Sequence, residues 1–158
     1  MQNKLSNILN LKLENYDFEG SLKKFLLQLA EKYNPAMVIL SGSLARGDYW
    51  HDSDVDLVVV LNRDRVNPVA DGIQLRRNLD YDFALDLFVY GKEQFKNMLN
   101  FGNLVALDAM EFGKILYVGN QDYYEEIKKL WNKVRKEWEP TEFGWRGVQI
   151  ENNKEVHR

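Results

Sequence analysis

Residues 40–61 constrain the fold of this chain more than any other stretch. A Gly-Ser pair, Gly42-Ser43, comes first, a polar and aromatic loop follows, and Asp54 then leads into an apolar run that ends at Leu61. Valine and leucine dominate that run, which predicts a short buried strand after a loop. The polar residues of this stretch are therefore expected at one end of a buried strand.

Two carboxylates lie at the start of the predicted strand. Because side chains alternate between the faces of a strand, Asp54 and Asp56 point the same way, about 7 Å apart. Like charges at that distance repel unless they share a cation, and hard oxygen ligands suit Mg²⁺ or Mn²⁺. A solvated strand end is the alternative for an isolated Asp-x-Asp pattern. An EF-hand calcium loop is excluded, because its glycine and glutamate positions hold Leu57 and Arg63.

The Gly-Ser turn upstream favours a binding role for these acids. Gly42 lets the backbone approach a ligand closely, and Ser43 can cap the next helix and bond an oxyanion. The start of a helix also favours phosphate. We therefore predict a phosphate-binding turn and metal-binding carboxylates on one hairpin-sized unit.

Two motifs of this stretch resemble a known family. Gly-Ser-x-Ala-Arg-Gly from Gly42 to Gly47, followed by Ser-Asp-x-Asp-Leu from Ser53 to Leu57, is similar to the signature of the minimal nucleotidyltransferases in the DNA polymerase beta superfamily. The resemblance covers roughly residues 23–138. It implies an α/β (α+β) fold of the polymerase beta-like nucleotidyltransferase type, with a small mixed β-sheet and helices mainly on one face.

A third carboxylate comes from a later strand, predicted over residues 81–90. Asp82 and Asp86 share one face of it, but Asp82 lies about 13 Å back along the strand. A mid-strand carboxylate among apolar residues is costly to bury without a cation. Asp86 also matches the third metal ligand of the family, so we choose Asp86.

The resemblance implies the chemistry of this site. Asp54, Asp56 and Asp86 would act as the catalytic residues and hold two Mg²⁺ ions. Gly42 and Ser43 would bind the β and γ phosphates of ATP. A hydroxyl acceptor would then attack the α phosphate, and pyrophosphate would leave.

The residues after the Gly-Ser turn add one further candidate. Arg46 lies inside the first motif, and we expect it to contact the triphosphate rather than to form a surface salt bridge. Tyr49 or Trp50 could stack on a nucleotide base, although loop aromatics more often pack the loop down. His51 is interpreted as a polar loop residue because no second histidine lies near it. Arg46 therefore joins the Gly-Ser turn as a predicted nucleotide contact.

The acceptor is suggested by the resemblance rather than by the residues. Stand-alone members of this family are often antitoxins encoded beside a HEPN-domain ribonuclease, and some silence that toxin by adenylylating a tyrosine. We therefore expect a Mg²⁺-dependent nucleotidyltransferase that moves AMP from ATP to a tyrosine of a HEPN toxin. A binding antitoxin without catalysis is one alternative, which the three intact acids argue against. The other is a small-molecule nucleotidyltransferase, such as those that modify aminoglycosides, but those enzymes usually bring a second helical domain.

Composition narrows the classes of function. The 158 residues carry a formal net charge of −3 and no cysteine. The acidic balance argues against nucleic acid as a direct substrate, and without cysteine neither a disulfide nor a cysteine zinc site can form. No signal peptide or membrane-length apolar run is present, so we expect a cytoplasmic protein with no membrane partner. A homo-oligomer is left open.

Hydrophobic spacing predicts the remaining architecture. We expect an N-terminal extension over residues 1–20, a nucleotidyltransferase domain over 21–138 and a C-terminal tail over 139–158, docked through Phe143 and Trp145. Helices are predicted over residues 21–33, from 67 onwards, and over 92–99, 103–111 and 122–138. Strands are predicted over residues 36–40, 54–61, 81–90 and 114–118.

Overall fold

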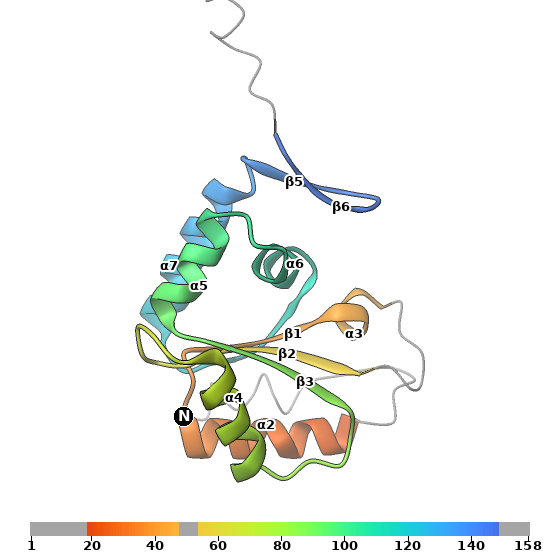
Figure 1. Cartoon of the computed structure of the whole chain (residues 1–158), viewed down its shortest axis with the longest axis vertical. Helices are drawn as coiled ribbons and strands as arrows, with labels where there is room; N and C mark the ends of the chain where they lie inside the picture. Colours follow the sequence, from red (N-terminus) through yellow and green to blue (C-terminus); the bar gives the residue numbers. More distant parts are fainter. Residues whose placement is uncertain (1–18, 48–53, 149–158) are drawn as a thin grey trace, which may run out of the picture.

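A four-stranded sheet lies at the centre of the computed structural model, which describes residues 19–47 and 54–148 (Figure 1). Its strands are β1 (Met37–Ser41), β2 (Val55–Val60), β3 (Leu85–Tyr90) and β4 (Lys114–Val118), in the spatial order β3-β2-β1-β4. β1 runs antiparallel to β2 and β4, whereas β2 and β3 are parallel. The predicted α/β fold with a small mixed sheet is therefore confirmed, although β3 is shorter than the predicted strand.

Helices cover both faces of this sheet. On one face lie α2 (Glu19–Tyr33) and α4 (Pro68–Asn78), and on the other lie α5 (Lys92–Asn100), α6 (Leu104–Phe112) and α7 (Gln121–Val134) (Figure 1). The two faces carry separate clusters of buried apolar side chains. The expectation that the helices lie mainly on one face is therefore wrong.

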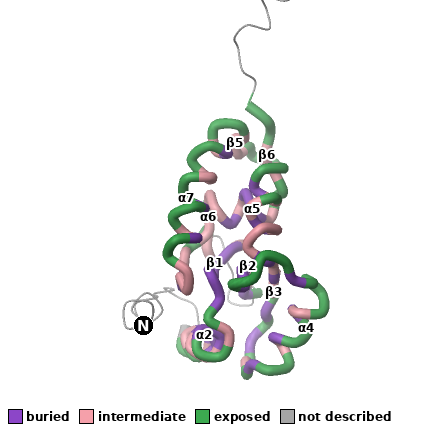
Figure 2. The backbone as a smooth tube through the Cα atoms, turned by 90° about the vertical axis from the view of Figure 1, so that its left-hand side faces the viewer, coloured by how far each residue is buried: buried purple, intermediate pink, exposed green. Residues whose placement is uncertain are grey.

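The sequence of β2 explains why both faces need cover. Leu57 and Val59 belong to the cluster beneath α2 and α4, while Val58 and Val60 belong to the cluster beneath α5, α6 and α7. All four side chains are fully buried, and the central strands are buried along most of their length (Figure 2). A strand that is apolar on both sides requires helices on both sides.

Asparagine side chains fix the first turn of three helices. Asn67, Asn103 and Asn120 are the N-caps of α4, α6 and α7, and each accepts at least one hydrogen bond from a backbone N–H of its own helix. These caps agree with the predicted helix starts. α7 ends at Val134, earlier than predicted, because Trp138 already belongs to the next strand.

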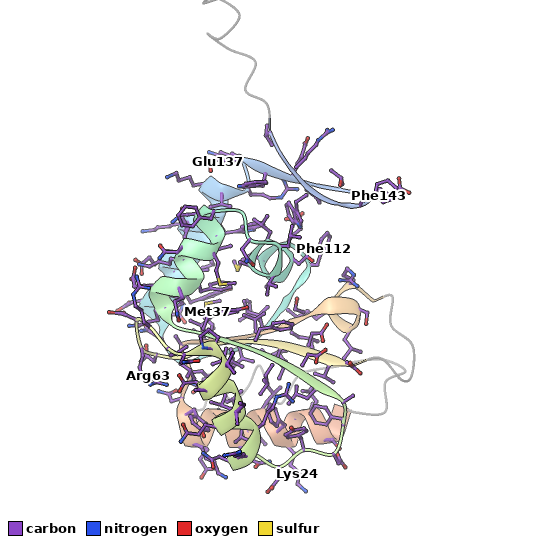
Figure 3. The ribbon with its side chains drawn as sticks, in the orientation of Figure 1. Lys24, Met37, Arg63, Phe112, Glu137 and Phe143 are labelled. Carbon is purple, nitrogen blue, oxygen red and sulfur yellow. The ribbon has the colours of Figure 1, made fainter. Side chains whose placement is uncertain are left out.

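The last described segment is a hairpin of β5 (Trp138–Thr141) and β6 (Gly144–Gly147). The Trp145 indole N–H donates a 2.7 Å hydrogen bond to Asp108 of α6, and its ring meets Trp131 of α7 edge-on. Phe143 lies at the hairpin tip and is 94% exposed (Figure 3). The predicted docking of this segment is therefore confirmed for Trp145 and wrong for Phe143.

Some predictions fall on residues that the structure does not describe. They are most of the N-terminal extension, the loop with Tyr49, Trp50 and His51, and the last ten residues of the tail. Within the described ranges, no helix combines the length and the apolar character needed to cross a membrane.

Candidate active site

One end of the sheet brings polar side chains of three strands side by side. The strand register pairs Ser41 of β1 with Asp56 of β2, and Asp56 with Asp86 of β3. Residues directly opposite in neighbouring strands point to the same face, so these three form a row, which we call the polar row. Ile39 and Val58 continue the same alternation and lie in the cluster beneath α5, α6 and α7. The polar row therefore faces the side of the sheet that carries these helices.

Burial and the neighbouring acids perturb the pKa of Asp56. The pKa of Asp56 is raised from its ordinary value of 3.8 to about 6. Partial burial is the largest cause, followed by the charge of Asp86 and a hydrogen bond with the Asp86 side chain. Asp54 adds further repulsion, while Arg46 opposes the shift. Asp56 therefore holds its proton more tightly than an isolated aspartate would.

Gly42 has two reasons to be glycine. Its φ of +69° is a left-handed conformation that other residues rarely adopt. A Cβ on this residue would also lie 2.9 Å from Cγ of Asp56, and closer still to Asp56 Oδ2. The sequence predicted Gly42 for the close approach of a ligand. In the structure, its missing side chain leaves room for a carboxylate of the chain itself.

The Gly-Ser turn forms the start of α3 (Gly42–Arg46), a short helix that follows β1. Ser41 occupies the N-cap position of this helix, without a side-chain capping bond, and Ser43 lies within its first turn. The prediction that Ser43 caps the helix is therefore wrong, because the helix already begins at Gly42. Arg46 lies at the other end of α3, where its side chain is exposed.

Asp54 lies at the margin of this group. It directly precedes β2 and is exposed, and its charge contributes to the raised pKa of Asp56. In the described parts of the chain, no three acidic, histidine or cysteine side chains converge closely enough to hold a metal ion. The structure thus brings Asp56 and Asp86 together as a pair. The assignment of all three acids as metal ligands stays a prediction.

A divalent cation fits the donor set of the Asp56–Asp86 pair. Carboxylate oxygens are hard ligands that suit Mg²⁺. The raised pKa of Asp56 indicates that the negative charge here is only partly compensated by its surroundings. A cation held by Asp56 and Asp86 would take the place of the proton on Asp56 and compensate that charge.

Ser41 is the member of the polar row that the sequence analysis did not single out. The first strand was predicted to end at residue 40, which assigned Ser41 to the loop. The sequence feature that could have identified Ser41 is its position between an apolar strand and a glycine turn. A strand longer by one residue, paired with the acidic strand, would have brought Ser41 beside the carboxylates.

Comparison with known proteins finds a matching family, a relative in sequence and a similar solved structure. The family model described as nucleotidyltransferase domain matches residues 22–140. A Methanocaldococcus jannaschii protein, provisionally named a protein adenylyltransferase, is 32% identical over 101 residues, which are 63% of this chain and 97% of the relative. A crystal structure of a toxin-antitoxin with AMP-PNP aligns over 71% of this chain and 85% of its own, at 19% identity and a TM-score of 0.45.

The match to the family model includes the whole central sheet. It begins in α2, ends in β5, and contains the polar row, the Gly-Ser turn and Asp54. The match thus covers well over half of the 158 residues. With its paired acids at the end of that sheet, the chain belongs to the nucleotidyltransferase domain family and is a nucleotidyltransferase.

Proposed function

We propose that this nucleotidyltransferase depends on Mg²⁺ and transfers AMP from ATP to a hydroxyl group of a protein. The observation that carries the proposal is the Asp56–Asp86 pair, held in register on two parallel strands beside Gly42. The name of the M. jannaschii relative supports a protein as the acceptor. We place the reaction in the cytoplasm, where ATP is available.

The acids would form the metal-binding part of the site. Asp54, Asp56 and Asp86 would hold two Mg²⁺ ions, which when bound neutralise phosphate charge and lower the pKa of an attacking hydroxyl. Asp56 and Asp86 occupy paired positions on adjacent strands, so their spacing is fixed before a substrate binds. Such preorganisation is a large part of catalysis in phosphoryl transfer.

The turn beside the acids would bind the phosphates. The half-buried Ser43 and the backbone at Gly42 would hold the β and γ phosphates, and Arg46 would donate hydrogen bonds to the triphosphate. Arg46 already lowers the pKa of Asp56, so its positive charge acts at this end of the sheet. ATP bound in this way would direct its α phosphate toward the acid pair.

The proposed reaction is an in-line displacement at the α phosphorus. The acceptor oxygen forms a bond to the α phosphorus, and the bond from that phosphorus to the bridging oxygen of the β phosphate breaks. Pyrophosphate leaves with the electron pair of the broken bond, and the proton of the acceptor hydroxyl passes to solvent. The product is an AMP ester of the acceptor.

The transfer can be tested with α-³²P-labelled ATP and Mg²⁺. The purified chain is incubated alone and with the product of the neighbouring gene, and the proteins are separated on a gel. We expect label on a protein band that depends on Mg²⁺ and is absent with Asp56→Asn, a variant of nearly the same shape. Wild-type labelling by Asp56→Asn would refute the role of Asp56. Mg²⁺-dependent ATP binding without any labelled protein would refute a protein acceptor.

We further propose, from the resemblance of the two sequence motifs, that the acceptor is a tyrosine of a HEPN toxin and that the chain is its antitoxin. Co-expression of such a toxin with the wild-type chain should then restore growth, while Asp56→Asn should not. Growth restored equally by both would favour an antitoxin that acts by binding alone. Label on an aminoglycoside or another small molecule, with none on the toxin, would favour a small-molecule nucleotidyltransferase.

A further inference from the structure

Ser41 combines burial with a polar side chain at the centre of the candidate active site. Among the described residues it alone is polar and buried, with 8% of its surface exposed. It is the last residue of β1 and lies next to Asp56 across the strand pair, with Gly42 following directly. Asp86 lies on the opposite flank of Asp56. Ser41 thus links the polar row to the proposed phosphate-binding turn.

The Ser41 hydroxyl has no hydrogen-bond partner within residues 19–47 and 54–148. It occupies the N-cap position of α3, where serine side chains commonly bond to the helix backbone, yet it makes no such bond. In the same ranges, no side-chain polar atom is both sealed from solvent and unpartnered. The hydroxyl of this nine-tenths buried residue therefore keeps access to solvent and can bond to a ligand.

The neighbouring groups indicate what this hydroxyl can bind. The hydrogen bond between Asp56 and Asp86 requires a proton, and once both carboxyls are ionised they can only accept hydrogen bonds. A serine hydroxyl can donate, so Ser41 is the one donor of the polar row. Because this hydroxyl is not sealed from solvent, an anionic oxygen of a ligand would replace a hydrogen bond to water with a stronger, charge-assisted one.

We propose that the Ser41 hydroxyl donates a hydrogen bond to a phosphate oxygen of the bound nucleoside triphosphate. The identity of the ligand rests on the proposed function, while the open donor rests on the geometry of β1 and α3. Ser41 extends the proposed contacts of Gly42 and Ser43 by one residue into the sheet. The phosphate chain is then held between α3 and the polar row.

Calorimetric titration of the full chain with α,β-methylene-ATP and Mg²⁺ tests this contact, because this analogue cannot transfer AMP. Ser41→Ala removes the hydroxyl and adds no volume. We expect it to weaken binding of the analogue about tenfold, with unchanged binding of adenosine and no loss of melting temperature. Ser41→Thr keeps a hydroxyl and should recover most of the affinity. Ser21→Ala, at a serine of α2 outside the polar row, is the matched control and should bind like wild type.

Two results would overturn the proposal. One is wild-type affinity of Ser41→Ala for α,β-methylene-ATP. The other is an equal loss of affinity for adenosine and for the analogue, since Ser41 would then support the shape of the site rather than bind phosphate. The labelling assay measures AMP transfer, so it tests the proposed function separately from phosphate binding by Ser41. A chain that binds the analogue through Ser41 but labels no acceptor retains this inference and loses the proposed transfer.

Discussion

The side chain of Asp56 fills the space beside Gly42, so the residue types at these two positions depend on each other. Asp56 Oδ2 occupies the place that a Cβ of residue 42 would take, and the Asp86 side chain bonds to the same carboxyl. Asp56 is thus held between a glycine and a second acid. A side chain at position 42 should therefore change the geometry of the acid pair before it changes the hydrophobic core.

Gly42→Ala tests this coupling, and Gly47→Ala is its matched control. Both glycines have a positive φ, +69° and +88°, so each substitution should cost about 1 kcal/mol of folding free energy through the backbone. Only at Gly42 would the new Cβ also collide, since nothing lies within 4 Å of it at Gly47. Displacement of Asp56 should lower the transfer rate of Gly42→Ala about a hundredfold. Transfer rates and urea unfolding measure both effects. An equal loss of transfer in the two variants would assign the effect to backbone strain instead.

The raised pKa of Asp56 predicts how stability depends on pH without metal. Its folded-state pKa of about 6 lies above the ordinary value of 3.8, so the folded chain binds this proton more tightly than the unfolded chain. The stabilising contribution is fully present below about pH 4 and is lost as the pH rises through about 6. Asp56→Asn removes this titration. In EDTA at about pH 7.5, we expect the variant to be about 1 kcal/mol more stable than wild type, after allowance for solvent screening.

Urea unfolding of wild type and Asp56→Asn across this pH range measures the difference. The gap between them should close toward about pH 4, and at neutral pH Mg²⁺ should narrow it by stabilising the wild type. A gap that is independent of pH would show that folding does not raise the pKa of Asp56. Mg²⁺ stabilisation of the variant equal to that of the wild type would remove Asp56 from the metal site.

The contacts between site residues were harder to predict than the residues themselves. Strand alternation placed Asp54 and Asp56 on one side, but the pairing of Asp56 with Asp86 depends on the parallel register of β2 and β3. The apolar pattern of those strands fits more than one register, because both faces of β2 are buried. Ser41 was missed because the ends of strands are set by pairing with a neighbour, which the sequence of one strand does not contain.

At the scale of elements, the periodicity of apolar residues was strong enough to predict the central sheet and its helices. The strand at Lys114–Val118 lies where the apolar pattern predicted it. The hairpin was missed, because its turn holds Glu142 and Phe143 rather than residue types that favour turns. Trp138 also continued the helical spacing of α7. In the structure, Trp138 packs against Gly102, where an added Cβ would meet its ring.

The two aromatic residues of β6 and its turn should contribute unequally to stability. Trp145 packs against Trp131 and bonds to Asp108, so Trp145→Ala should lower the free energy of unfolding by about 2 kcal/mol. Phe143 is 94% exposed, and Phe143→Ala should change it by less than about 0.5 kcal/mol. Urea unfolding of both variants measures the difference. Equal destabilisation by the two substitutions would mean that Phe143 packs against the domain in solution.

At the scale of the whole molecule, one sheet separates two hydrophobic layers. Phe25 of α2 is fully buried in one layer, and Phe95 of α5 is fully buried in the other. β1 and β2 contribute alternate side chains to both layers, so the loss of either layer would expose one face of the sheet that carries the acid pair. The two layers should therefore unfold together.

Phe25→Ala and Phe95→Ala test this cooperativity from opposite sides of the sheet. Each leaves a cavity in a packed layer and should lower the free energy of unfolding by about 3 to 5 kcal/mol.

Two probes distinguish the layers. Tryptophan fluorescence reports mainly on the layer of Phe95, because that layer contains Trp131, Trp138 and Trp145, while far-ultraviolet circular dichroism reports on the whole fold. If the layers unfold as one unit, Phe25→Ala shifts the urea midpoint equally by both methods. A fluorescence midpoint that stays at the wild-type value in Phe25→Ala would show that the layer of α5, α6 and α7 is stable without the other. In that case the strands that carry the acid pair would need α2 and α4 to stay folded. Binding of α,β-methylene-ATP should then be lost at a lower urea concentration than the one at which the tryptophan signal changes.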